Sequence, residues 1–170
     1  MQPILILGIG NILLCDEGAG VRAIERMRAL ALPEGVELLD GGTSGADLVD
    51  EIADRRKLIV IDAVNAEAVP GTIFRCTAAD LLADSTSSLS LHEFGFLSTL
   101  HMARQLGCAP HEVVLFGVQP KEIELRLELS DEVAAALPKL IELVLEEART
   151  TGQRASREEG QGKTIRTEAV

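Results

Sequence analysis

The sequence predicts an α/β domain in which helices cover both faces of a sheet, giving a three-layer sandwich. Short apolar runs that end in glycine or aspartate alternate along the chain with segments of helical periodicity. The first of these runs is unbroken, which is typical of a parallel strand covered on both faces. The resulting order of strand, helix, strand, helix and strand favours crossover connections that place helices on the two faces.

The first half of the chain contains three predicted strands and two predicted helices. The strands are the apolar runs 3–9, 36–39 and 58–61, and we expect the first of them to be central in the sheet. From residue 18 to residue 32 apolar residues recur at helical spacing, which predicts an amphipathic helix. Ser44 is placed to cap a second helix that continues through Ala53.

The second half adds further strands and two longer helices. The strands are expected at 72–76, which follows the turn signal Pro70-Gly71 and returns across the sheet, at 113–118, and as a weakly alternating edge ribbon at 123–129. The helices are expected at 90–106, with Ser90 as its N-cap, and from Ser130 to about residue 149, with Pro138 inside it.

Composition and charge narrow the class of protein. We expect one domain over residues 1–150 and a disordered tail over 151–170, because the tail has almost no large apolar residue. No apolar run approaches the roughly 20 residues of a membrane span, and no secretion signal is visible, so we expect a cytoplasmic protein without direct membrane binding. The formal net charge of −11 argues against a nucleic-acid partner, since phosphates require a cationic surface.

Acidic residues and one histidine follow the predicted strands, where ligands collect in open α/β sheets. They are Asp16 and Glu17 after the first strand, Asp40 after the second, Asp62 after the third, and His92 near the start of a helix. Two carboxylates and an imidazole in one crevice can hold a divalent ion and leave positions open for a substrate ligand. The alternative is structural: Asp16 and Glu17 would favour the positive N-terminus of the next helix, and Asp62 would cap a turn.

Four motifs in combination resemble the hydrogenase maturation endopeptidase family. They follow the family's order and spacing, and the resemblance covers about residues 4–148. The motifs are Gly8-Ile9-Gly10-Asn11-Ile12-Leu13-Leu14 with Asp16-Glu17 and Gly20, then Asp40-Gly41-Gly42-Thr43-Ser44-Gly45, then Asp62-Ala63-Val64, and Ser90-Leu91-His92-Glu93-Phe94-Gly95. The resemblance implies an α/β/α sandwich with a mostly parallel five-stranded sheet.

The same resemblance implies an endopeptidase that removes a C-terminal extension from the large-subunit precursor of a nickel-iron hydrogenase. The family's metal ligands fall on Glu17, Asp62 and His92, and the position of Asp40 is implicated in activity or recognition. In the family, cleavage follows nickel insertion, and the nickel in the precursor is the recognition signal. The motifs 40–45 and 116–120 resemble the branch that serves membrane-bound uptake hydrogenases. We expect a monomer.

Three hypotheses about function stay open. A protease would use the nickel to polarise the scissile carbonyl, to activate water, or only to dock the substrate, with Asp16 or Asp40 as candidate general bases. A non-catalytic assembly chaperone would bind the nickel-loaded large subunit without cutting it. A nucleotide-binding module would need a third glycine at the position of Leu13, and the apolar leucine fits a pyrophosphate poorly.

Overall fold

The structure is a computed structural model of the chain and describes residues 2–77, 80 and 93–161. Its sheet has the strand order β2-β1-β3-β5-β4, and only the β4–β5 pair is antiparallel. The strands are β1 (Gln2–Ile9), β2 (Val36–Gly42), β3 (Arg55–Ala63), β4 (Ile73–Thr77) and β5 (Val113–Val118). The mostly parallel five-stranded sheet is therefore confirmed, and β1 lies inside it while β3 is the middle strand.

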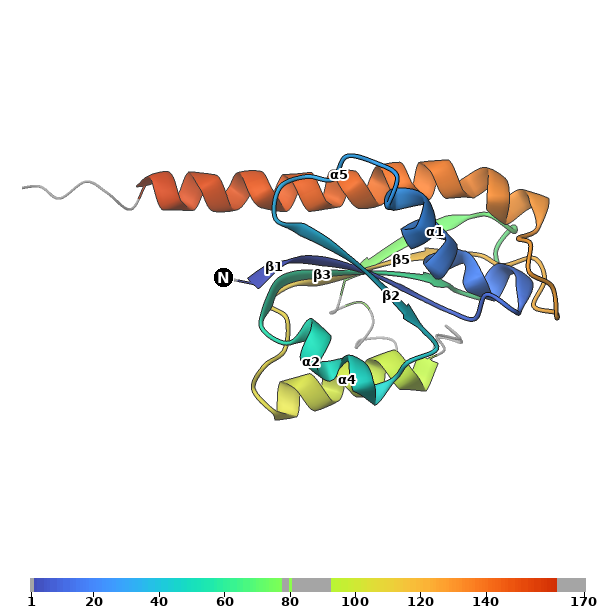
Figure 1. The fold of residues 1–170 in the computed structure, drawn as a ribbon, viewed down its shortest axis with the longest axis horizontal. Coiled ribbons are helices and arrows are strands. Elements are labelled where there is room, and N and C mark those ends of the chain that lie inside the picture. Colours follow the sequence, from blue (N-terminus) through green and yellow to red (C-terminus); the bar gives the residue numbers. More distant parts are fainter. Residues whose placement is uncertain (1, 78–79, 81–92, 162–170) are drawn as a thin grey trace, which may run out of the picture.

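Helices cover the sheet on both faces, which confirms the three-layer arrangement. In Figure 1, α1 and α5 lie on one side of the sheet, and α2 and α4 lie on the other. The helices are the 3-10 helix η1 (Cys15–Gly18), α1 (Ala19–Met27), the 3-10 helix η2 (Ala46–Leu48), α2 (Val49–Ile52), α4 (Glu93–Gln105) and α5 (Asp131–Gln161).

Alternate residues of each strand serve opposite faces of the sheet. On β1, Ile4 and Ile6 pack into a cluster with α1 and α5, whereas Leu5 and Leu7 pack into a cluster with α2 and α4. All four side chains are almost fully buried. Burial of each such side chain contributes roughly 1.5–3 kcal/mol. Because both faces are covered, the strand needs no polar alternation, and this explains its unbroken apolar run.

The two helices predicted in the first half differ from the structure. The segment predicted as one helix over 18–32 forms the shorter helix α1, which directly follows η1, and Leu30 lies beyond α1 and is 48% exposed. The chain instead turns back to β2 through Gly35, whose φ of +73° suits glycine. The helix expected after Ser44 forms as η2 followed directly by α2, with Ala53 as the C-cap, and α2 begins without a side-chain cap.

In the second half, β4 and β5 are confirmed, whereas the edge ribbon at 123–129 is wrong. This segment forms no strand and makes one isolated bridge, between Leu14 and Arg126. Its alternating apolar side chains face solvent, because Ile123, Leu125 and Leu127 are all more than half exposed. Helix α5 contains Pro138, as expected, and continues past residue 149 to Gln161. The proposed N-cap Ser90 and residues 162–170 lie outside the described residues.

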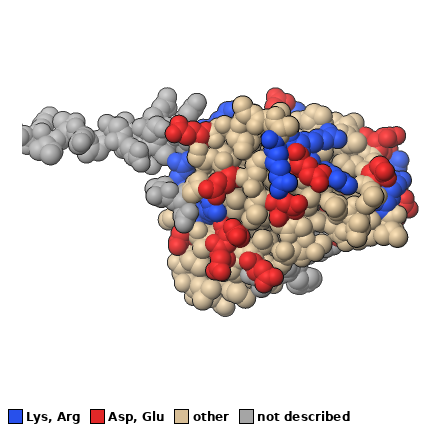
Figure 2. Space-filling view, in the orientation of Figure 1, with Lys and Arg blue, Asp and Glu red and all other residues tan. Residues whose placement is uncertain are grey.

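Charged side chains of both signs are interspersed on the surface. On the face drawn in Figure 2, acidic groups lie beside basic ones. Exposed pairs such as Arg22–Glu25, 2.9 Å apart on α1, add little stability individually. Within the described part of the chain, no helix combines the length and the apolar character that a bilayer crossing requires.

Candidate functional site

The carboxyl ends of β1, β2 and β3 meet at one edge of the sheet because the three strands are parallel neighbours. Gly8 of β1 pairs with Asp40 on one side and with Ile61 on the other. Asp62 follows Ile61 directly, so Asp40 and Asp62 lie at the same edge. This is the edge at which the strand assignments predicted the polar residues to gather.

The segment that carries Glu17 packs directly on these strand ends. A methyl carbon on Gly20 would overlap the carbonyl oxygens of Ile61 and Ile9, so α1 begins in backbone contact with β1 and β3. A methyl carbon on Gly10 would overlap the Glu17 carbonyl oxygen, and η1 contacts β3. The space left by these glycines is therefore filled by the chain's own backbone. This packing argues against the nucleotide-binding hypothesis, which needs that space for a pyrophosphate.

Glu17 and Asp62 bring two buried carboxylates to this edge. Glu17 is 3% exposed and Asp62 is fully buried, and the Ala63 amide donates a hydrogen bond of 2.8 Å to Asp62 Oδ1. A carboxylate in such a place needs cations, protons or hydrogen-bond donors to compensate its charge. Carboxylate oxygens combined with an imidazole are suitable donors for a borderline divalent ion. The chemistry of this pair therefore fits a metal contact at the strand ends.

The third predicted ligand, His92, lies outside the described residues. Among the residues that the structure describes, no group of three or more histidine, cysteine, aspartate and glutamate side chains is arranged to hold a metal ion. The Glu17, Asp62 and His92 trio thus stays a prediction, of which the structure brings two members to one edge.

Asp40 occupies the rim of the same edge and is exposed. Its Oδ1 accepts a hydrogen bond of 2.9 Å from the Gly42 amide, and the Gly42 carbonyl accepts one of 2.8 Å from the Gly10 amide. The glycine-rich loop after β2 is thereby joined to the turn that contacts Glu17. Asp40 is accessible to a substrate, and its catalytic role stays a prediction.

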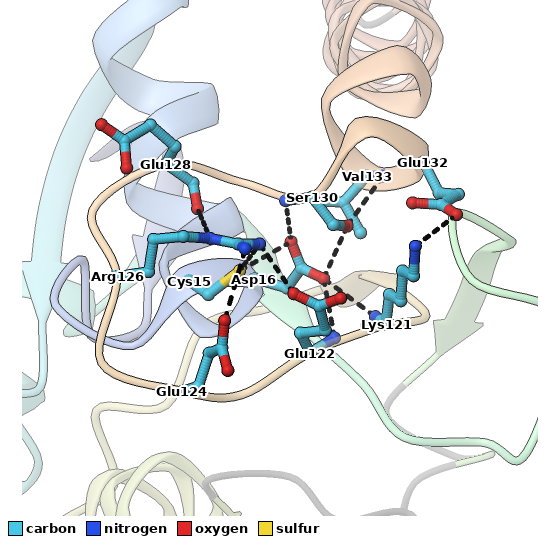
Figure 3. A network of polar contacts seen from close by, with 10 residues as sticks. All are labelled: Cys15, Asp16, Lys121, Glu122, Glu124, Arg126, Glu128, Ser130, Glu132 and Val133. Carbon is cyan, nitrogen blue, oxygen red and sulfur yellow. Dashed lines mark hydrogen bonds and ion pairs between the residues drawn. The ribbon is translucent and has the colours of Figure 1, made fainter.

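Asp16 has surroundings quite different from those of Glu17, although the two are neighbours in sequence. Its carboxylate is fully buried and accepts hydrogen bonds from Ser130, Lys121 and Glu122, as Figure 3 shows. Burial alone would raise the pKa of Asp16, but the hydrogen bonds from Ser130 and from the Lys121 and Glu122 amides outweigh it. The pKa of Asp16 consequently lies below its usual value, and the group is held as an anion.

Gln119 organises the loop after β3, and it entered the sequence-based prediction only as part of a motif. Its side-chain oxygen accepts hydrogen bonds from the Ala66 amide at 2.8 Å and the Ala68 amide at 3.2 Å. Its side-chain nitrogen donates to Asn65 Oδ1 at 3.1 Å. The available signal was a polar residue directly after the fully buried strand β5.

Comparisons with known proteins agree on one family. Residues 21–147 match the family HycI, described as hydrogenase maturation protease. The hydrogenase 2 maturation protease of Escherichia coli (strain K12) is 38% identical over 154 residues, which cover 89% of this chain and 94% of that protein. The hydrogenase expression/formation protein HoxM of Azotobacter vinelandii is 38% identical over 166 residues, covering 95% and 80%. The solved structure of the hydrogenase maturating endopeptidase HybD from E. coli superposes with a TM-score of 0.81 at 38% identity, covering 88% and 94%.

Proposed function

The chain belongs to the hydrogenase maturation protease family, and from this premise we propose that it removes the C-terminal extension of a nickel-iron hydrogenase large-subunit precursor after nickel insertion. It is an endopeptidase of hydrogenase maturation. The observation that carries the finer proposal is the buried carboxylate pair of Glu17 and Asp62 at the strand ends. The resemblance assigns metal contact to both positions, together with His92.

We propose that the nickel ion arrives as part of the substrate. Two carboxylates and one imidazole are too few ligands to complete a coordination sphere, so the precursor's own thiolates would complete it. Nickel in this place would supply Lewis acidity at the scissile carbonyl or serve as a docking signal. Binding of the precursor would then itself depend on the presence of its nickel ion.

The chain's own residues have separate tasks in this proposal. Glu17 and Asp62 bind and orient the loaded precursor from a position that excludes water. Asp40 is exposed at the rim, with one oxygen held by the Gly42 amide, and is the better candidate to accept a proton from the attacking water. Asp16 already accepts hydrogen bonds at both of its oxygens.

We also propose that the client is an uptake-type, membrane-bound hydrogenase. The support is similarity to proteins named HupD and HoxM, including a HupD of Thiocapsa roseopersicina that is 39% identical over 163 residues. The glycine-rich loop 40–45 and the segment 116–120 carry the corresponding motifs.

The decisive experiment incubates the purified full-length chain with nickel-loaded and nickel-free precursor in parallel and follows the precursor's mass. The expected result is loss of the C-terminal extension from the loaded precursor alone. The rate of precursor cleavage should fall by at least about tenfold in each of the variants Glu17→Gln, Asp62→Asn and His92→Ala. Changes to groups that only support metal ligands already have effects of this size, so loss of a ligand should have at least as large an effect.

Glu34→Gln is the matched control, because Glu34 is exposed in the loop before β2. It should cleave like the unchanged chain. Undiminished cleavage in all three site variants would remove the trio from the mechanism. Binding of the loaded precursor without any shortening would instead support the non-catalytic chaperone.

A further inference from the structure

A segment more than a hundred residues away holds the turn that carries Glu17. The Cys15 amide donates to the Arg126 carbonyl at 2.7 Å, and the Arg126 amide donates to the Leu13 carbonyl at 3.0 Å. The guanidinium of Arg126 also donates to the Cys15 sulfur at 3.0 Å. Figure 3 shows residues of the segment 121–130 converging on Cys15 and Asp16. The turn and the segment are therefore one hydrogen-bonded unit.

The Asp16 carboxylate is the centre of this unit. Its Oδ1 accepts from the Ser130 amide at 2.7 Å, and its Oδ2 accepts from the Ser130 hydroxyl at 2.8 Å, the Lys121 amide at 2.8 Å and the Glu122 amide at 3.1 Å. The Ser130 hydroxyl in turn accepts from the Val133 amide in the first turn of α5. One side chain thus connects both ends of the segment, and the start of α5, to the turn.

The turn has little means of holding its own shape. The helix η1 is four residues long, and a single helical turn is not stable by itself. Cys15 adopts a φ of +54°, a left-handed conformation that costs a non-glycine residue roughly 1–2 kcal/mol. Such a conformation persists only where the surrounding structure imposes it. The contacts with segment 121–130 supply that constraint.

We propose that Asp16 is a positioning residue, which fixes the direction of the Glu17 carboxylate by clamping the turn to segment 121–130. Glu17 follows Asp16 in η1, so a change in the backbone of the clamped turn moves Glu17 directly. The importance of this for catalysis rests on the proposed function of Glu17. The clamp itself does not, because it concerns only contacts within the chain.

The first test reads the clamp without any substrate, by amide hydrogen exchange in Asp16→Asn. The amide group that replaces one oxygen presents N–H bonds to backbone N–H donors, so the contacts with those backbone amides are lost. Exchange should become at least about tenfold faster at the amides of residues 15–17, while the amides of β1 and β3 keep their protection. Asp50→Asn, at an exposed position on α2, is the control and should match the unchanged chain. Unchanged protection at residues 15–17, or a uniform increase across the chain, would overturn the proposal.

The second test separates positioning from loss of folded protein, by measuring affinity for nickel-loaded and nickel-free precursor. The ratio of the two affinities does not depend on the fraction of folded chain. In Asp16→Asn the preference for loaded precursor should fall by at least about tenfold. In Val144→Ala, which weakens the core at a fully buried position of α5, the preference should stay.

If Asp16→Asn prefers nickel-loaded precursor as strongly as the unchanged chain does, the positioning role is wrong. If the unchanged chain itself shows no preference, nickel recognition in the proposed function is wrong. The hydrogen-exchange result then still decides whether Asp16 clamps the turn.

Discussion

At position 20 a methyl group has no room, because it would overlap the carbonyl oxygens of Ile61 and Ile9. Both obstacles are backbone atoms at strand ends and cannot rotate away. In Gly20→Ala, α1 and the preceding turn must therefore move off the sheet. Overpacking of this kind costs typically 1–3 kcal/mol. We expect the free energy of unfolding to fall by about that amount and precursor cleavage to be largely lost, because Glu17 moves with the turn.

Gly35→Ala is the matched control for this prediction. A methyl group there meets nothing within 4 Å, but φ is +73°. The variant should lose about 1 kcal/mol through backbone strain alone and keep its cleavage rate. Urea unfolding and the precursor assay measured on both variants decide the matter. Equal activity in the two would show that the backbone contact at Gly20 does not position the site.

Neighbouring residues Asp16 and Glu17 show what could be predicted at this scale. Their position after a strand predicted that acidic groups would gather at one edge, and Glu17 and Asp62 do lie there. Nothing local distinguishes the role of Asp16 from that of Glu17. The donors that reach Asp16 from outside the turn are Lys121, Glu122 and Ser130, and their approach depends on how the whole chain folds.

At the scale of elements, the buried strands were predictable and the surface segments were less so. An unbroken apolar run such as β5, which is buried at every position, is typical of a strand covered on both faces. The weak alternation over 123–129 predicted an edge ribbon, but no strand forms there. Its apolar residues face solvent. Backbone contacts of Arg126 with Leu13 and Cys15 hold the segment, and Asp16 binds the residues that flank it, at positions 121, 122 and 130.

Pro138 weakens helix α5 at an exposed position. It has no amide to donate to the Ala134 carbonyl, and proline in a helix interior is about 3 kcal/mol less favourable than alanine. Part of this cost is offset because proline also restricts the unfolded chain. Pro138→Ala should therefore raise the free energy of unfolding by about 1–2 kcal/mol and leave cleavage unchanged. Lys139→Ala, at the next exposed position, is the control and should change the free energy of unfolding by less than about 0.5 kcal/mol. Urea unfolding of both variants measures the difference. A loss of stability in Pro138→Ala would mean that the proline ring is needed for packing.

The polar segment 151–170 is predicted to add nothing to the folded domain. The last core residue of α5 among those whose burial is described is Ala148. A chain ending at Thr150 should unfold within about 0.5 kcal/mol of the full chain and cleave the precursor at the same rate. Thermal unfolding and the precursor assay test this. A drop in cleavage alone would indicate that the segment contacts the client.

Across the whole molecule, the candidate site and the main buried ion network lie at opposite ends of the sheet. Lys57 precedes Asp62 by five residues on β3, which corresponds to roughly 16 Å along the strand. The Lys57 side chain is 2% exposed, and its ammonium group pairs with Glu112 and Glu147. Arg75 on β4 also pairs with Glu147, at 2.8 Å, and so joins the edge strand to α5. We therefore expect that changes in this ion network alter stability without altering the candidate site.

Glu147 makes this network sensitive to acid. Hydrogen bonds from Arg75 outweigh the effect of burial and, with Lys57, lower the pKa of Glu147 from 4.5 to about 2. Because the folded-state pKa lies below the unfolded value, the stabilisation is fully present above about pH 4.5 and is lost as the pH falls towards 2. A shift of this size corresponds to a contribution on the order of 3 kcal/mol.

Urea unfolding of the unchanged chain and of Glu147→Gln, at about pH 7 and at about pH 3, isolates this contribution from the general effect of reducing the net charge. The glutamine cannot titrate, so the stability difference between the two proteins should shrink by about 2 kcal/mol on acidification. Glu146→Gln removes a carboxylate from the adjacent, exposed position of α5, and its difference from the unchanged chain should stay constant. If the two variants behave alike, the acid sensitivity belongs to the charge of the molecule as a whole and not to the buried contacts of Lys57 and Arg75.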